Sequence, residues 1–432
     1  MMKKRALCLL SAATLSLCML QTGFADEATN YSTDALHVAI WDNAQLDGLQ
    51  QIADKWTEQS GVKVNIDVIT WGEYWTLLEA GAMGGEMPDV FWMHINEAEK
   101  YTSNGILLNL DDYIAADDAI DLGNYYEGIV ELYSYDGSQY ALPKDHDSMA
   151  LLYNKAIFDK YGVEYPKDEW TWDDFADAAA TITEAGAEDG VYGTAVNVDD
   201  GQNCWYSIVF DYGGNLISED KKTSMMDDEN TIAAFEWIGD RLIPIMPSQS
   251  IMAETGNQSL FLSGLIAMTF QGSWMVNTFY QAENSADYAW AQLPYYDKNG
   301  NGTCEKEERC FSYNGLGWAA SANTEDPQAA YDLISWFCSK EGQTMQSELG
   351  VTLAGYIGCS EPFIEAFEGM DLTAFTDIEE DGTPVMHPNS KSTANWDNAI
   401  NVGLIPAWND PSTMEDVCRS IAQTMNEILA NE

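Results

Sequence analysis

Four tryptophans of the chain stand next to turn-forming and small polar residues, where a packed core would not favour an indole. An indole offers a large, rigid apolar face with a single N–H donor at its edge. A sugar ring fits that combination, because its C–H face stacks on the indole while its hydroxyls bind nearby Asp, Asn and Glu side chains. For any single tryptophan a place in the core is the alternative, but four together favour a carbohydrate-binding site. They occur in Trp41-Asp42-Asn43, Trp71-Gly72-Glu73, Gly272-Ser273-Trp274 and Asn395-Trp396-Asp397.

A second pattern indicates a metal ion. Residues 297–308 match the EF-hand loop D-x-[DN]-x-[DN]-G-x5-E at every defined position, and Gly302 allows the sharp turn. The segment before the loop, 293–296, is typical of a strand or loop and not of a helix, so a polar Asn/Gly hairpin is the alternative. We expect a structural calcium site away from the sugar. Its predicted ligands are the side chains of Asp297, Asn299, Asn301 and Glu308 and the carbonyl of Thr303.

The charge of the chain excludes some classes of ligand. The formal net charge is −51, from 19 Lys and Arg against 70 Asp and Glu. Nucleic acid is excluded as a partner because binding to phosphates needs basic patches. Acidic polysaccharides are poor candidates for the same reason, and the acidic excess itself is explained by solubility.

Residues 1–25 have the pattern of a signal peptide. A cationic start is followed by an apolar run over residues 6–20 and by small residues just before Asp26. We therefore expect an exported protein that begins at Asp26 and works in the periplasm or at the cell surface. The alternative is a lipid anchor at Cys18, which would favour a small residue where Leu17 stands.

Six cysteines follow the predicted signal peptide. An even number in an exported protein permits disulfides, but the sequence does not choose among the pairings. Cys304–Cys310 is the only local loop closure among them, and the absence of a Cys-x-x-Cys motif indicates no zinc site. The six are Cys204, Cys304, Cys310, Cys338, Cys359 and Cys418.

The tryptophans are positioned by alternating strands and helices. Short β-type runs at 36–40, 62–68 and 88–93 are separated by segments with helical spacing of apolar residues. This alternation predicts an α/β fold with a parallel sheet, and ligands bind beyond the carboxyl ends of such strands. Trp41, Trp71 and Trp92 all follow strands at those ends.

The length and the middle of the chain predict two lobes. About 400 residues exceed what one hydrophobic core usually serves. Near Pro143 one extended run stops and another begins within a few residues, which is typical of a crossing between lobes. A helix then starts at Thr171, the expected N-cap, with Asp174 completing a capping box.

Five motifs in order along the chain resemble family 1 extracellular solute-binding proteins. These are the sugar-capturing components of ABC importers, and maltose-binding protein is a familiar relative. Each motif alone is weak, and together they span nearly the whole mature chain. They are Pro88-Asp89, the run 150–155, the helix start 171–175, the run 261–268 with Gly272-Ser273-Trp274, and 313–318 with the helix 327–338.

The resemblance implies two α/β lobes, each a mostly parallel sheet flanked by helices, joined by three hinge crossings. This is the periplasmic-binding-protein fold, type II-like. The expected boundaries are 34–142 for the first part of lobe 1, 143–283 for the first part of lobe 2, 284–342 for a return to lobe 1 that carries the calcium-type loop, and 343–432 for C-terminal helices of lobe 2.

The resemblance also implies ligand contacts. Trp71 joins the expected set through its position after a strand, and Trp318 and Trp336 are expected in the core. Around Asn96 the sequence departs from maltose-binding protein, so maltose itself is not implied. The expected ligand-binding residues are Trp41, Asp42, Trp71, Trp92, His94, Asn96, Asp147, Trp205, Trp274 and Trp396.

These observations predict a substrate-binding component of an ABC sugar importer. It captures a mono- or oligosaccharide between two lobes, delivers it to a membrane permease, acts as a monomer, and needs no cofactor beyond the structural calcium. The alternative is a secreted glycoside hydrolase, but acidic residues are so abundant that no catalytic pair stands out. The G-x-S-x-G, H-E-x-x-H and P-loop motifs are absent, so we expect no enzyme. A surface adhesion module would lack the crossing near Pro143.

Overall fold

The computed structural model describes residues 31–432. The predicted signal peptide at 1–25 and the alternative lipid anchor at Cys18 lie outside these residues. Within the described part of the chain, no helix is long and apolar enough to cross a membrane.

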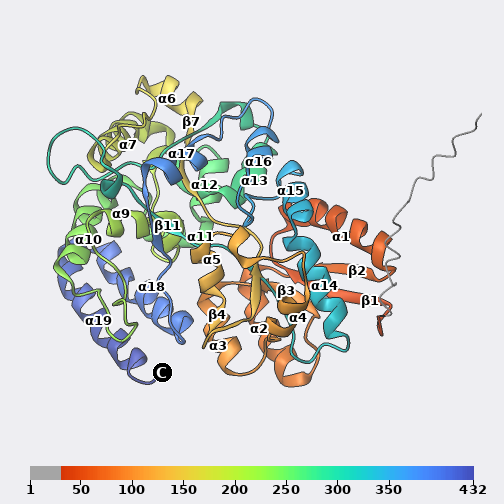
Figure 1. The fold of residues 1–432 in the computed structure, drawn as a ribbon. Coiled ribbons are helices and arrows are strands. Elements are labelled where there is room, and N and C mark those ends of the chain that lie inside the picture. Colours follow the sequence, from red (N-terminus) through yellow and green to blue (C-terminus); the bar gives the residue numbers. More distant parts are fainter. Residues whose placement is uncertain (1–30) are drawn as a thin grey trace, which may run out of the picture. The chain divides into compact units, whose positions relative to one another are not determined.

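The first lobe is built on a five-stranded sheet in the order β2-β1-β3-β12-β6. β1 pairs in parallel with both β2 and β3, and β12 is the one strand that runs in the opposite direction. The connections from β1 to β2 and from β2 to β3 pass through α1 and α2, which confirms the predicted alternation of strands and helices (Figure 1). The elements are β1 (Ala35–Ile40), α1 (Leu46–Ser60), β2 (Lys63–Val68), α2 (Trp71–Gly84), β3 (Val90–Met93), α3 (Ile95–Ser103), β6 (Ala141–Pro143) and β12 (Gly317–Ala320).

The second lobe is built on a four-stranded sheet in the order β10-β7-β9-β8. Here β7 alone runs against the other strands, because it is antiparallel to both β9 and β10 while β8 and β9 are parallel. Each sheet therefore has all strands but one in a common direction, as expected. The strands are β7 (Met149–Asn154), β8 (Tyr192–Thr194), β9 (Ile266–Gly272) and β10 (Tyr288–Ala291).

Helices of the second lobe pack against its sheet, and α18 carries the expected contact Trp396. α7 packs against β8, and its N-terminus has the expected capping box, in which Thr171 and Asp174 bond to each other's backbone N–H groups. α18 and α19 pack against each other near the C-terminus. The helices are α7 (Trp172–Gly186), α8 (Gly201–Cys204), α9 (Tyr206–Asp211), α10 (Glu229–Arg241), α12 (Asn257–Leu262), α13 (Val276–Tyr280), α18 (Thr393–Asn409) and α19 (Met414–Leu429).

The strand pairing differs from the expected lobe boundaries in two places. β10 lies within 284–342 but pairs with β7 of the second sheet, so the return to the first sheet begins only after β11 (Cys310–Tyr313). α15 (Lys340–Glu348) packs against α1 and α14 (Pro327–Cys338), and it therefore belongs with the first lobe past residue 342. A short β run does not reveal which sheet edge it will join, because that depends on contacts far away in the sequence.

Three crossing segments run together between the two sheets. Lys144 donates its backbone N–H to Leu316 O at 2.8 Å, and Asp147 donates its own to Asn314 O at 2.7 Å. Asp145 forms an antiparallel bridge with Ala354. The crossing between β6 and β7 thus contacts both other crossings, one around residues 314–316 and one around Ala354. It places Asp147 at the boundary of the lobes.

Candidate functional site

Aromatic rings gather where β1 and β3 of the first sheet end. Trp41, directly after β1, makes edge-to-face contacts with Trp71 at 5.0 Å, Tyr74 at 5.0 Å and Trp92 at 4.9 Å between ring centroids. Such pairs contribute roughly 0.5–1.5 kcal/mol each beyond their burial. Trp71 is the first residue of α2 and remains 46% exposed, with its ring 5.4 Å from that of His94. Trp41 therefore braces a second indole that remains about half exposed to solvent.

Asp42 shapes the turn that follows Trp41. Its carboxylate accepts the backbone N–H of Ala44 at 2.8 Å and the side-chain amide of Gln45 at 3.0 Å. The same turn contacts the second lobe, because the amide of Asn277 in α13 donates to Ala44 O at 2.9 Å. The expected contact residue Asp42 thus lies where the two lobes touch.

Two neutral histidines connect the aromatic group to polar side chains. Burial lowers the pKa of His94 to about 4, and burial and then the charge of His94 lower that of His387 to about 3. His94 Nδ1 accepts the backbone N–H of Asn96 at 3.2 Å, and the two imidazole centroids lie 5.8 Å apart. His387 Nε2 lies 3.1 Å from Asn96 Oδ1, to which it donates.

The side-chain amide of Asn314, in the crossing around residues 314–316, faces His94. Asn314 Nδ2 lies 3.1 Å from His94 Nε2. Because Nδ1 of the neutral His94 ring accepts, Nε2 carries the proton and needs an acceptor. Asn314 Oδ1 is buried and has no hydrogen-bond partner among the described residues. We therefore assign Oδ1 as the atom that accepts from His94, which satisfies both groups.

Asp147 extends this network toward the second lobe. Its carboxylate is buried and accepts the amide of Gln202 at 2.8 Å. Burial, and then the neighbouring Asp145, raise the pKa of Asp147 to about 7. Asp145 itself pairs with Lys144 at 2.6 Å, so the one lysine of this crossing is already neutralised.

Two side chains complete the network from the second lobe. The ring of Tyr206, at the start of α9, lies 5.4 Å from that of His387. Its hydroxyl donates to Asp397 Oδ1 of α18 at 3.4 Å, and burial raises the pKa of Asp397 to about 6. We call the connected set the junction. It consists of Trp41, Trp71, His94, Asn96, Asp147, Gln202, Tyr206, Asn314, His387 and Asp397.

Comparison with known proteins identifies the family. The family of bacterial extracellular solute-binding proteins matches residues 42–344, more than half of the chain. The chain belongs to this family.

Relatives and solved structures agree with that assignment. The maltotriose-binding protein of Pyrococcus abyssi is 26% identical over 327 residues, 74% of this chain and 66% of that protein. The diacetylchitobiose binding protein DasA of Streptomyces coelicolor is 26% identical over 284 residues, 63% of each chain. The match thus spans just under two thirds of these relatives.

The ABC substrate-binding protein Lmo0181 of Listeria monocytogenes, in complex with cycloalternan, superposes with a TM-score of 0.81 at 22% identity over 92% of this chain and 99% of that one. The GacH receptor of Streptomyces glaucescens gives 0.76 at 19% identity, again over 92% and 99%. These structures support the two-lobed fold.

Three of the expected aromatic contacts are core residues in this solute-binding protein. Trp92, Trp205 and Trp396 are all 0% exposed, so no indole face is open to a ligand. Trp92 packs on Trp41 and has Lys144 Nζ 4.5 Å from its ring. The indole N–H of Trp205 donates to the Val198 carbonyl, and that of Trp396 donates to Ser390 Oγ. We therefore leave these three indoles out of the ligand site.

Trp274 keeps a partly exposed side chain directly after β9. Its ring folds back over Gly272, where a Cβ atom would come within 2.0 Å of the ring. Only glycine leaves room for this position of the indole. Trp274 lies three residues before Asn277, which contacts the first lobe, so it stays a candidate contact beside the junction.

Five junction residues were not predicted, namely Gln202, Tyr206, Asn314, His387 and Asp397. Two of them directly follow a predicted tryptophan, since Tyr206 follows Trp205 and Asp397 follows Trp396. In each of these two segments the predicted tryptophan is buried, and the residue after it belongs to the junction. Gln202 and His387 carry no sequence signal, because they reach the junction only through the fold.

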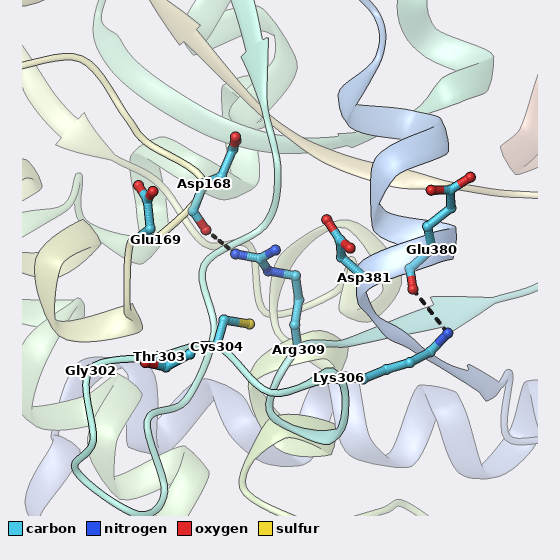
Figure 2. Close-up of a pocket in the computed structure, with 9 residues that line it drawn as sticks. All are labelled: Asp168, Glu169, Gly302, Thr303, Cys304, Lys306, Arg309, Glu380 and Asp381. Carbon is cyan, nitrogen blue, oxygen red and sulfur yellow. Dashed lines mark hydrogen bonds between the residues drawn. The ribbon is translucent and has the colours of Figure 1, made fainter.

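The calcium-type loop lies in the second lobe, outside the junction. Gly302, Thr303 and Cys304 of this loop border a cavity of about 500 Å³, together with residues of two other segments (Figure 2). Across the described residues, no group of three or more His, Cys, Asp and Glu side chains is arranged to hold a metal ion on its own. The six cysteines of the described part of the chain are all unpaired, so the local closure Cys304–Cys310 is not formed.

The raised pKa of Asp147 predicts a pH dependence. An acid whose folded pKa exceeds its unfolded value stabilises the protein below the unfolded value and loses that contribution as the pH rises through the folded one. From pH 4 to 7 we expect Asp147→Asn to gain stability relative to wild type by on the order of 1 kcal/mol per pH unit. Urea denaturation at each pH measures this difference. A constant difference across the window would contradict it, and Asp118→Asn, an exposed carboxyl, is the control.

Proposed function

We propose that this protein is the substrate-binding component of an ABC importer and that it binds a mono- or oligosaccharide at the junction. The observation that carries the proposal is the open face of Trp71, braced by Trp41 and adjoining the neutral His94. Stacking on such a face supplies affinity, and fixed polar groups around it select the positions of the hydroxyls. The names of the relatives, among them maltotriose- and diacetylchitobiose-binding proteins, support the same class of ligand.

The charges at the junction favour a neutral sugar. Asp147 and Asp397 present carboxyl groups, and the two histidines are neutral at ordinary pH because burial lowers the pKa of each. Lys144 is fully buried and paired with Asp145, so it is not free to bind an anion. A uronic acid or a sugar phosphate would bring a negative charge against these carboxyl groups.

The two-lobed fold supports a capture mechanism. Three crossing segments connect the lobes, and a rotation about them would open or close the junction around a ligand. Closure would bring Tyr206 and Asp397 of the second lobe toward a sugar already stacked on Trp71. The closed protein would then present the sugar to the permease as a single chain.

The same family membership supports a binding role without catalysis. We further infer export by a signal peptide ending before Asp26, with a lipid anchor at Cys18 as the alternative form of attachment. Mass spectrometry of the protein purified from its native cell distinguishes a free Asp26 terminus from an acylated Cys18.

A glycan panel tests the proposal. We expect at least one neutral mono- or oligosaccharide to bind with one-to-one stoichiometry in isothermal titration, and uronic-acid oligomers not to bind. A reducing-end assay on the same sugars should detect no cleavage. Release of reducing ends would identify a hydrolase instead, and heat from uronic-acid oligomers alone would contradict the assignment of a neutral ligand.

A further inference from the structure

The loop at 297–308 is folded around its own side-chain oxygens. Asp297 accepts the backbone N–H groups of Asn301 at 3.1 Å and Gly302 at 2.9 Å. Asn301 Oδ1 in turn accepts the N–H of Thr303 at 2.7 Å. Gly302 has a φ of 71°, a left-handed conformation that favours glycine. These bonds curl the backbone so that positions 1, 3 and 5 of the motif lie on one turn.

Glu308 closes the loop with a buried carboxylate. It is only 6% exposed, and its Oε1 lies 3.1 Å from the side-chain amide of Asn299 and 3.2 Å from the N–H of Lys298. Its Oε2 accepts the N–H of Glu305 at 3.2 Å. Within residues 31–432 no Lys, Arg or His forms an ion pair with this carboxylate. A buried charge without a counter-charge is costly, which is an independent indication that a cation belongs beside it.

A second carboxylate, that of Glu305, also faces the Asn299 amide. Glu305 Oε1 lies 3.5 Å from Asn299 Nδ2 and 3.3 Å from Asn301 Nδ2. Glu305 and Glu308 thus lie beside neutral amides, and within the described residues neither carboxylate forms an ion pair. The donor set consists of carboxylate, amide and carbonyl oxygens. Such an all-oxygen set suits Ca²⁺, whereas zinc and copper favour nitrogen and sulfur ligands.

We propose that the loop binds one Ca²⁺ ion through the side chains of Asp297, Asn299, Asn301 and Glu308 and the Thr303 carbonyl. The negative charges of Asp297 and Glu308 would be neutralised by the ion, and Glu305, at position 9, would act directly or through water. The inference does not rest on the sugar-binding proposal, because no junction residue belongs to the loop.

The C-terminal end of the loop is hydrogen-bonded to other segments of the second lobe. An ion bound in the loop would therefore stabilise those segments as well as the surface turn. Tyr296 donates its N–H to Glu308 O at 2.9 Å, and Lys306 Nζ donates to Glu380 O at 3.1 Å. The next residue, Arg309, reaches across to the carbonyl of Asp168 (Figure 2). β11 begins at Cys310 and pairs with β13 (Thr383–Met386). Calcium would therefore order the start of a strand pair that leads to Asn314 and His387 at the junction.

Titration of calcium chloride into chelator-treated protein tests the proposal. We expect one site per chain by equilibrium dialysis, with a Kd of about 10⁻³ M or tighter. The melting temperature should rise by several degrees in ~10 mM calcium, because the ion binds the folded state. Glu308→Gln should lose both the bound ion and the rise in melting temperature. Glu307→Gln, an exposed neighbour in the same turn, should keep both.

The wild-type measurement stands even if Glu308→Gln fails to fold. No bound calcium and no change in melting temperature in the wild-type protein would overturn the proposal. It would also be overturned if Glu308→Gln and Asn299→Ala, both folded by circular dichroism, bound calcium as the wild type does. Sugar binding is measured separately, so a failed calcium site would leave the proposed function untouched.

Discussion

Replacing Trp71 with alanine should weaken sugar binding about 10- to 100-fold while lowering the melting temperature by only a few degrees. The side chain is 46% exposed, so its truncation leaves little cavity in the folded protein. The lost stacking face is worth roughly 1.5–3 kcal/mol, which corresponds to that change in affinity. Isothermal titration with the best sugar from the panel measures the affinity, and differential scanning calorimetry measures the stability.

Two further variants separate stacking from a general effect of losing an indole. Trp71→Phe should recover part of the affinity, because the phenyl ring keeps a smaller apolar face. Trp170→Ala removes a partly buried indole that is not part of the junction, and it should leave sugar affinity within about twofold. Wild-type affinity in Trp71→Ala would show that this face does not touch the sugar, and Trp274 would become the better candidate.

Local patterns in the sequence were sufficient to predict much of the first lobe. β1, α1, β2 and α2 follow from apolar spacing and β-branched runs that need no distant partner. The assignment of β10 to the second sheet could not be predicted, because its four residues carry no information about which edge strand they meet. The same limit explains why the return to the first lobe comes later than expected.

The candidate site divides in a similar way. The sequence could single out Trp41 and Asp42, which directly follow a strand, because strand ends are local features. His387 and Asn314 were missed or unassigned, because only the fold brings them to His94. On α18 the predicted contact Trp396 is buried, and the next residue, Asp397, belongs to the junction. Successive residues of a helix point about 100° apart, so the buried Trp396 and the junction residue Asp397 occupy different faces of α18.

This difference between neighbours gives the last prediction, that Trp396→Ala should lower the free energy of unfolding by about 3–5 kcal/mol. The indole is 0% exposed, and its N–H donates to Ser390 Oγ at 2.9 Å. Truncation therefore leaves a large cavity and removes one hydrogen bond, and that cost is a large share of the 5–15 kcal/mol that usually stabilises a folded protein. Urea denaturation followed by circular dichroism measures the loss.

The adjacent substitution Asp397→Asn should have the opposite profile. Stability should change little, because asparagine keeps the shape of the side chain and an oxygen that accepts from Tyr206. Sugar binding should weaken, because the carboxyl group that we assign to the sugar is lost. Trp396→Phe should fall between wild type and alanine in stability, because it retains most of the packing but not the N–H donor. If Trp396→Ala instead weakened sugar binding without loss of stability, the indole would have to face the ligand, and the junction would need to be redrawn on that side of α18.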